Sequence, residues 1–431
     1  MKPKEFIGFS DFDAPDSNVV DTCIHCGLCL NECPTYRVLR VEMDSPRGRI
    51  QLINAVNKGH LSLNDESFQK HMFLCLDCHG CESACPSGVE YGSILEAART
   101  QANQVGREPR GIKIANRIMK HLFGNPWLLR STAKMLRAYQ RSGFRDLILD
   151  MLPERLRLME GLTPAISSYF IHPKTMSHVP ALGKPQYTVG FLSGCIMSVA
   201  FTHVHEASLR VLARNGCEVH LPKDQICCGA LNYHNGDRAT ARTWAKRNLV
   251  AFDDPKYDAI VVNSAGCGST MKSWADLLQQ DPEFSEVADR VSKKVYDFSE
   301  WLAHIGIQTP PNKIDARVAY QDACHLRHAQ GITAQPRDLI SRVSGTTVVD
   351  LDQPHLCCGS AGVYSAINTD LSLQILDEKL DSIESSHATH IITTNPGCQS
   401  HIAAGLNRRN QDVKIVHIAE FLDAAYEGSD I

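Results

Sequence analysis

Long hydrophobic runs are absent from this sequence of 431 residues. No stretch approaches the roughly eighteen uninterrupted apolar residues that a membrane-spanning helix needs. The first residues, Met-Lys-Pro-Lys-Glu-Phe, lack the apolar segment of a secretory signal, so we expect a cytoplasmic protein. A basic excess is also missing, because 48 acidic residues against 44 basic ones give a net charge of −4. This balance argues against a nucleic-acid-binding protein.

A dinucleotide-binding motif is missing too, since no G-x-G-x-x-G stands between a predicted strand and a predicted helix. We therefore expect no flavin or nicotinamide site on this chain. Cysteine is what the sequence has instead, with 17 residues. This is about 4 per cent of the chain, below the density of a small disulfide-stapled domain. In a reducing compartment, so many thiols indicate metal or redox chemistry.

Eight of the cysteines form two matching C-x₂-C-x₂-C-x₃-C-P runs, over Cys23–Pro34 and Cys75–Pro86. This is the bacterial spacing for a cubane [4Fe–4S] cluster, because three thiolates two residues apart can hold three corners of one cube. Zinc sites use C-x₂-C pairs but rarely the whole run, so two cubanes are favoured. In two-cluster ferredoxins the fourth cysteine of each run reaches the other cluster. The predicted ligands are Cys23, Cys26, Cys29 and Cys85 for the first cluster, and Cys75, Cys78, Cys81 and Cys33 for the second.

A helix start is predicted between the two runs, with Ser45 as N-cap and Pro46 as the first helical residue. Two arginines, Arg47 and Arg49, follow in its first turn. They either pair with the anionic clusters or a partner protein, or lie on an exposed first turn. The sequence leaves both interpretations open.

A basic segment without cysteine follows the second run. Residues 107–160 contain twelve Lys or Arg and five Asp or Glu, a local balance of 12 − 5 = +7 in a protein of net charge −4. Its helical patches predict a linker that packs the two halves of the chain together. The alternative is a basic amphipathic surface that lies on an anionic membrane.

The C-terminal half is an internal repeat that contains eight further cysteines. The spacing from the first cysteine to the Cys-Cys-Gly is 32 positions in one copy and 33 in the other (227 − 195 and 357 − 324). The spacing onward to the last cysteine is 40 and 41 positions (267 − 227 and 398 − 357). The two quartets are Cys195, Cys227, Cys228 and Cys267, and Cys324, Cys357, Cys358 and Cys398. Cys217 has no counterpart, so we interpret it as a core residue.

Each copy alternates β-rich runs with helical stretches, which predicts parallel strands covered by helices. We expect strands at 187–192 and 259–263 and a helix at 202–214. Because ligands gather at the carboxyl ends of parallel strands, each quartet should converge on one site. A metal is the leading interpretation, either zinc or another iron–sulfur cluster, with reactive thiols as a further alternative.

The predicted fold class is α/β plus α-helical, with a helical two-cluster ferredoxin-like domain, a helical linker and a duplicated Cys-Cys-Gly α/β domain with parallel sheets. The expected domains are 1–105, with the two clusters, a basic linker at 106–186, and two Cys-Cys-Gly domains at 187–308 and 309–431. No catalytic residue is predicted on this chain.

Nearly the whole chain resembles the iron–sulfur subunits of bacterial glycolate oxidase. The Cys-Cys-Gly module alone is shared with the iron–sulfur subunit of anaerobic glycerol-3-phosphate dehydrogenase, with lactate-utilisation proteins and with heterodisulfide reductase. The heterodisulfide reductase pattern ends in C-x-x-C, whereas Thr270 and His401 stand at that position here, which argues against disulfide reduction. The most specific motifs are Cys23-Ile-His-Cys26-Gly, Asp44-Ser-Pro-Arg-Gly-Arg-Ile, Ser264-Ala-Gly-Cys267-Gly, His355-Leu-Cys-Cys-Gly-Ser-Ala-Gly-Val-Tyr364 and Gly397-Cys-Gln-Ser-His401.

The resemblance implies a division of labour between subunits. A flavin-containing partner would oxidise glycolate to glyoxylate, and this chain would pass electrons through its clusters towards quinone or another acceptor. The complex would be peripheral on the cytoplasmic face of the inner membrane. The alternatives are the iron–sulfur subunit of a lactate or glycerol-3-phosphate dehydrogenase, or a thiol–disulfide enzyme.

Overall fold

The computed structural model describes residues 6–106 and 108–431, which divide into two compact units. The first unit comprises the residues up to Lys120 together with Leu231–Ala241 and Leu356–Lys379. The second comprises His121–Ala230, Arg242–His355 and Leu380–Ile431. The first inserted segment begins just after the first Cys-Cys-Gly motif, and the second contains the second Cys-Cys-Gly motif. The division of the chain into four domains stays a prediction.

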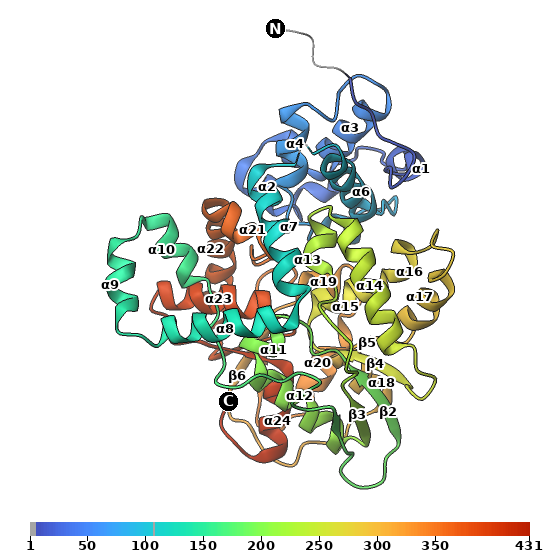
Figure 1. Ribbon diagram of the computed structural model, residues 1–431. Helices are drawn as coiled ribbons and strands as arrows, with labels where there is room; N and C mark the ends of the chain where they lie inside the picture. Colours follow the sequence, from blue (N-terminus) through green and yellow to red (C-terminus); the bar gives the residue numbers. More distant parts are fainter. Residues whose placement is uncertain (1–5, 107) are drawn as a thin grey trace. The chain divides into compact units, whose positions relative to one another are not determined.

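The first unit is helical, and its cysteine loops lie between short helices (Figure 1). Ser45 is the N-cap of α3 and accepts a hydrogen bond from the Gly48 amide, with Pro46 as the first helical residue. The predicted helix start is therefore confirmed. Its helices are α1 (Ser17–Asp21), η1 (Leu28–Leu30), α2 (Pro34–Leu39), η2 (Glu42–Asp44), α3 (Pro46–Asn57), α4 (Glu66–Phe73), α5 (Gly80–Ser83) and α6 (Tyr91–Gln104).

An apolar core joins α3, α4 and α6 of this unit. Ile53, Phe68 and Ile94 are fully buried in it, one from each helix. Fully burying a side chain of this size contributes about 1.5–3 kcal/mol, so this core stabilises the loops that hold the cysteines. Ile367, from the segment after the second Cys-Cys-Gly, packs against the same core.

The basic segment forms helices, as its patches predict. They are α7 (Arg110–Phe123), α8 (Pro126–Gln140), α9 (Phe144–Met151) and α10 (Glu154–Gly161). Asn125 caps α8 by accepting from the amides of Trp127 and Leu128. Within the described residues, no helix is both long enough and apolar enough to cross a membrane.

The second unit contains two sheets with the same strand arrangement. The first has the order β1-β3-β2-β4-β5, and all its neighbours are parallel except β1 and β3. The second has the order β7-β6-β8-β9 and is wholly parallel. The strands are β1 (His178–Val179), β2 (Tyr187–Phe191), β3 (Cys217–His220), β4 (Ala259–Val262), β5 (Val295–Asp297), β6 (Arg317–Tyr320), β7 (Thr347–Val349), β8 (His390–Thr393) and β9 (Lys414–His417).

Helices of the second unit connect these strands. Their bounds are α11 (Met197–Ala200), α12 (Thr202–Arg214), α15 (Ala265–Lys272), α16 (Trp274–Leu277), α17 (Ser285–Ser292), α18 (Phe298–Ile305), α19 (Cys324–Arg327), α20 (Ala334–Ser341), α23 (Pro396–Arg408) and α24 (Ile418–Glu427). Four other helices of the repeat belong wholly or partly to the first unit: α13 (Ala230–His234), α14 (Arg238–Phe252), α21 (Tyr364–Ile367) and α22 (Thr369–Ser386).

The internal repeat and the fold class are confirmed by this architecture. Removing β1 from the first sheet leaves the order β3-β2-β4-β5, which matches β7-β6-β8-β9 strand for strand. The last strand of each copy leads into a helix with a capping box, Asp297 with Glu300 in one and His417 with Glu420 in the other. The expected strands at 187–192 and 259–263 and the helix at 202–214 are present as β2, β4 and α12.

One strand was not expected from the sequence. Residues 172–186, at the end of the expected linker at 106–186, show no periodicity, yet His178 and Val179 form β1 at the edge of the first sheet. A two-residue strand is too short to produce an alternating pattern, and its partner β3 lies about forty residues further on. Tertiary pairing therefore determines this strand.

Candidate functional site

The second cysteine run gathers its predicted ligands around one small pocket in the first unit. Cys33, from the first run, lines this pocket with three cysteines of the second run. Helix α5, which follows His79 in the second run, packs against η1 of the first run. Cys33, the predicted fourth ligand of the second cluster, therefore lies close to the other three ligands. That these thiols bind a cluster stays a prediction. The thiols at the pocket are Cys33, Cys75, Cys78 and Cys81.

Arg49 forms one wall of this pocket and is completely buried. Its Nη1 lies 3.9 Å from Sγ of Cys33, and its Nη2 donates to Oγ1 of Thr35 at 3.1 Å. Its Nε donates to the carbonyl of His71 at 2.7 Å, and its Nη2 lies 3.6 Å from Oδ1 of Asp44. Arg49 therefore presents a fixed positive charge to the thiols of the second cluster.

Arg47 lies on the other side of the same helical turn and is partly exposed. It pairs with the Glu42 carboxylate at 2.6 Å and donates to the carbonyl of His25 at 3.2 Å. The two arginines thus divide between the alternatives that the sequence left open: Arg49 faces the cysteines, and Arg47 lies on the exposed first turn.

The first cysteine run forms a more open loop. Cys26 is exposed, whereas Cys23 and Cys29 are partly buried. Burial raises the pKa of the Cys29 thiol to about 11, with nearby Cys23 and Cys33 adding to the increase. Gly27 has a φ of 86°, and a Cβ there would come within 2.7 Å of the Arg47 side chain. The backbone turn that spaces these thiols therefore requires glycine.

The donor groups in this unit suit iron–sulfur clusters. The amide of Asp77 donates to Sγ of Cys75 at 3.4 Å, and the amide of Val89 donates to Sγ of Cys85 at 3.5 Å. Such N–H to sulfur bonds, with a nearby arginine, stabilise an anionic thiolate cluster and tune its potential. The residues present thus fit iron–sulfur clusters. The assignment of one cubane to Cys23, Cys26, Cys29 and Cys85 and of the other to Cys75, Cys78, Cys81 and Cys33 stays a prediction.

A buried charged network surrounds the loop of the second run, and sequence reasoning missed it. His234, on α13, places its Nδ1 3.3 Å from Oδ2 of Asp77 and 2.8 Å from Oε1 of Glu96. Burial alone would lower the pKa of His234, but the hydrogen bonds to these two carboxylates raise it to about 10. Arg99 donates to the carbonyls of Cys75 and His234 at 2.5 and 2.8 Å. The network therefore fixes the loop to the segment after the first Cys-Cys-Gly.

The first Cys-Cys-Gly quartet converges as the repeat predicts. Sγ of Cys227 lies 3.4 Å from Sγ of Cys195. Hydrogen bonds from Cys195 and Cys228, with burial, raise the pKa of Cys227 well above its ordinary value. A hydrogen bond with Cys228, together with burial, raises the pKa of Cys267 in the same way. Cys195 and Cys267 follow the adjacent strands β2 and β4, and Cys227 and Cys228 follow β3. Four such thiols can hold a metal, whose identity the sequence leaves open.

The second quartet lies in two parts. Cys324 and Cys398 follow the adjacent parallel strands β6 and β8, both in the second unit. Cys357 and Cys358 belong to the first unit. That all four converge stays a prediction.

Cys357 has a neighbour that the sequence did not indicate. A hydrogen bond with Cys357, together with burial, raises the pKa of Cys78 well above its ordinary value. The second Cys-Cys-Gly motif therefore lies beside the predicted ligands of the second cubane. Gly359 makes the turn possible, because its φ is 89° and a Cβ would lie 2.6 Å from the carbonyl of Ser372. No local sequence signal announces a contact between two such distant thiols.

Cys217 lies on β3 and is completely buried, as expected for a core residue. The indole N–H of Trp301 donates to its sulfur at 3.4 Å. It contributes to packing and not to either quartet.

Three family models match the chain. A 4Fe-4S dicluster domain matches residues 19–89, and a cysteine-rich domain matches residues 189–272 and 318–403. The linker region of the glycolate oxidase iron–sulfur subunit matches residues 113–163. The matches cover the two cysteine runs, the basic segment and both copies of the repeat.

Whole-length relatives are similar to this chain. The probable glycolate oxidase iron–sulfur subunit of Bacillus subtilis is 36% identical, over 94% of each chain. The glycolate oxidase iron–sulfur subunit of Escherichia coli is 31% identical, over 90% of each chain. Lactate utilization protein A of Bacillus subtilis is 30% identical over 53% of this chain and 96% of its own length. This chain belongs to the family of glycolate oxidase iron–sulfur subunits.

Proposed function

We propose that this chain is the electron-transfer subunit of a glycolate dehydrogenase that contains a separate flavin subunit. Electrons from glycolate oxidation on the flavin subunit enter this chain and leave towards a quinone. Two [4Fe–4S] clusters supply one-electron carriers with little geometric change on reduction. The chain's own residues hold the clusters, set their charge environment and exclude water from the second.

One observation carries this proposal. Three thiols of the second run and Cys33 of the first line one pocket, and the thiol of Cys78 among them is hydrogen-bonded with the thiol of Cys357 in the second Cys-Cys-Gly motif. Ferredoxin-type thiols and the repeat's thiols are thus adjacent within the first unit. Adjacent redox-active sites are what an electron carrier requires.

Glycolate is favoured as the partner's substrate by the extent of similarity. The two glycolate oxidase relatives match over 90% or more of this chain, whereas the lactate utilization protein matches about half of it. A lactate or glycerol-3-phosphate dehydrogenase remains the second candidate, and the donor used in the assay distinguishes them.

The purified chain alone is expected not to oxidise glycolate, because it has no predicted flavin site. After anaerobic mixing with its flavin subunit, glycolate should produce the paramagnetic signal of reduced clusters, detected by electron paramagnetic resonance. Lactate and glycerol-3-phosphate serve as alternative donors in the same mixture. Cluster reduction by glycolate without the flavin subunit would contradict the proposed division of labour.

Helices α8 and α9 support a peripheral membrane contact, which we propose as part of this function. Residues 126–151 contain five basic and two acidic residues. Large apolar side chains project into solvent between them, with exposed fractions from 60 to 80%. Basic helices with exposed apolar groups bind anionic lipid surfaces. The exposed apolar residues are Trp127, Met135, Phe144, Leu147 and Met151.

Removing two exposed charges here is expected to weaken binding to anionic vesicles. Each basic residue near such a surface contributes about 1 kcal/mol, so Lys134→Gln with Arg141→Gln should lower partitioning about thirtyfold. The measurement is flotation with vesicles that contain phosphatidylglycerol, at two salt concentrations. Lys184→Gln with Lys313→Gln changes the net charge equally at exposed positions elsewhere and is the control.

Equal flotation of both double variants would refute the membrane contact. If assembly with the flavin subunit is lost instead, the α8–α9 surface binds that subunit.

A further inference from the structure

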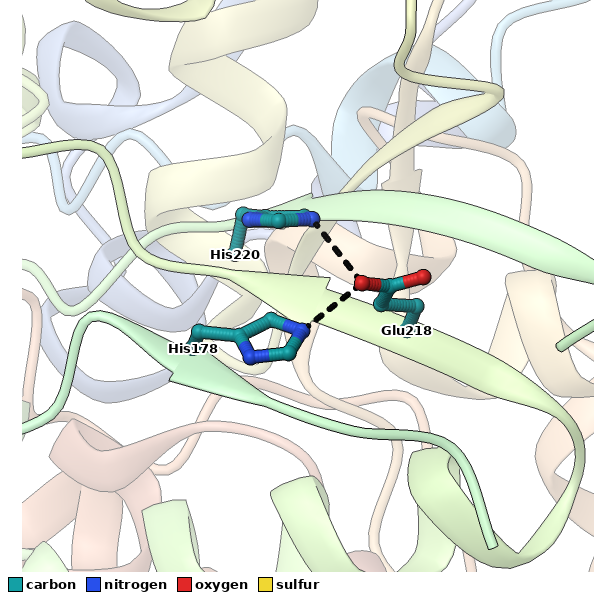
Figure 2. A group of neighbouring side chains, drawn as sticks. All are labelled: His178, Glu218 and His220. Atoms are coloured by element: carbon teal, nitrogen blue, oxygen red, sulfur yellow. Dashed lines mark hydrogen bonds and ion pairs between the residues drawn. The ribbon is translucent and has the colours of Figure 1, made fainter. Parts of the chain in front are cut away.

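Three side chains of types that can bind a metal ion lie close together on a solvent-facing side of the first sheet, and none of them belongs to a predicted cysteine site (Figure 2). His178 is on β1, and Glu218 and His220 are on β3. Side chains two residues apart on a strand share a face, and β3 buries Cys217 and Val219 on the other. Glu218 and His220 therefore both point outward.

The strand register brings the third residue to the same place. His178 is the direct antiparallel partner of His220. Opposite residues on such a pair have Cβ atoms about 4.5–5.5 Å apart, on the same face. The Leu221 amide also donates to the carbonyl of Ser177 at 2.9 Å, which continues the ladder past this pair. Backbone pairing thus holds the three side chains together before any ligand binds.

The ligand atoms are spaced for a small cation. Oε1 of Glu218 lies 2.8 Å from Nε2 of His178 and 3.8 Å from Nε2 of His220. A tetrahedral zinc ion with bonds of 2.0–2.1 Å requires ligands about 3.3 Å apart, between these two distances. Figure 2 shows both imidazoles turned towards the same carboxylate oxygen. Small side-chain rotations would place all three ligand atoms around one ion.

We propose that His178, Glu218 and His220 form a binding site for a divalent transition-metal ion of the zinc class. Two imidazoles and one carboxylate are a donor set that zinc uses, with water at the fourth position. All three side chains are partly exposed, so an ion can enter from solvent. An ion bound there would link β1 to β3. It would thereby fasten the segment that follows the basic helices to the edge of the first sheet.

The neighbouring charges permit a cation at this site. Lys256 is near His220, but its ammonium is paired with Asp254 at 2.9 Å. The buried group Asp77, Glu96 and His234 is a contrasting case, although its ligand atoms are equally close. There Arg99 and Arg238 already supply positive charge, at 3.7 Å from Asp77 and 3.9 Å from Glu96. Of these two groups, a metal ion is therefore expected only at the exposed one.

The test counts zinc ions on the complete, cluster-loaded chain. Zn²⁺ is titrated anaerobically in competition with a chromophoric chelator, because free cysteines also bind zinc and only a difference is informative. The wild-type chain should bind one more ion than His178→Ala with His220→Ala. A control variant, His60→Ala with His121→Ala, removes two other exposed imidazoles and should match the wild type.

A milder variant covers the case in which the double substitution disturbs folding. Glu218→Gln keeps both imidazoles and should weaken zinc binding at least about tenfold, since even outer-shell substitutions cost 10–100-fold. Crystals soaked with Zn²⁺ should show an anomalous peak between β1 and β3. Equal zinc stoichiometry and affinity in the wild type and all site variants, with no such peak, would overturn the proposal.

Discussion

Replacing Cys78 by serine is expected to remove one of the two cubane signals and to abolish electron transfer through the chain. Cys78 lies at the pocket that is also lined by Cys33, Cys75 and Cys81, and its thiol is hydrogen-bonded with that of Cys357. A neutral serine hydroxyl is a much weaker iron ligand than the cysteine thiolate that it replaces, so the second cluster should be lost. Iron content should fall from about eight to about four atoms per chain. Electron paramagnetic resonance of the reduced protein gives the second readout.

Two further variants make this result specific. Cys26 lies in the exposed part of the first run. Cys26→Ser should remove the signal of the first cubane, which is the signal that survives in Cys78→Ser. Cys217→Ser is the control, because this buried thiol touches the Trp301 indole and neither cluster. It should keep both signals. Loss of the same signal in Cys26→Ser and Cys78→Ser would contradict the ligand assignment.

Local chemistry explains what could be predicted from the sequence. The thiol spacing of each run reflects the shape of a cubane, so it is readable without a fold. The N-cap at Ser45 depends on residues within one helical turn, and it was correct. The repeat predicts parallel strands in both copies, and the two sheets have them, although their strand order came only from the structure. All these features depend on neighbours in sequence or on duplication.

Long-range contacts explain what could not be predicted. His234 reaches Asp77 and Glu96 only because the segment after the first Cys-Cys-Gly belongs to the first unit. The contact of Cys78 with Cys357 arises in the same way from the second copy. Neither contact has a local pattern. The opposite environments of Arg47 and Arg49 also required the structure, because a first helical turn can be buried or exposed.

Replacing Arg49 by methionine is expected to destabilise the chain and to lower the reduction potential of the second cluster. Burial alone would lower the pKa of Arg49, but Cys75, Tyr91, Cys33 and Asp44 outweigh it and raise it. Leaving a buried charge without a partner typically costs about 3–5 kcal/mol. Here the buried Asp44 would lose the guanidinium at 3.6 Å but keep the His71 ring at 2.7 Å, so we expect a smaller loss. The free energy of unfolding, from denaturant titration of the loaded chain, measures this loss.

The potential changes for a separate reason. Adding an electron to the second cluster increases negative charge beside Cys33, whose sulfur lies 3.9 Å from Nη1 of Arg49. Without that positive charge the reduced form is less stable, so the cluster should be reduced only at a lower potential. Redox titration followed by electron paramagnetic resonance resolves the two clusters, and the first should move less.

Arg47→Met is the matched control, because it removes the same charge from the same helical turn at an exposed pair with Glu42. Exposed pairs contribute about 0–1 kcal/mol, so its stability and its second-cluster potential should stay near those of the wild type. Arg49→Lys keeps the charge but cannot contact both Thr35 and the His71 carbonyl as the guanidinium does. It should restore most of the potential and only part of the stability. Equal shifts in Arg47→Met and Arg49→Met would show that the potential follows net charge and not the buried contact.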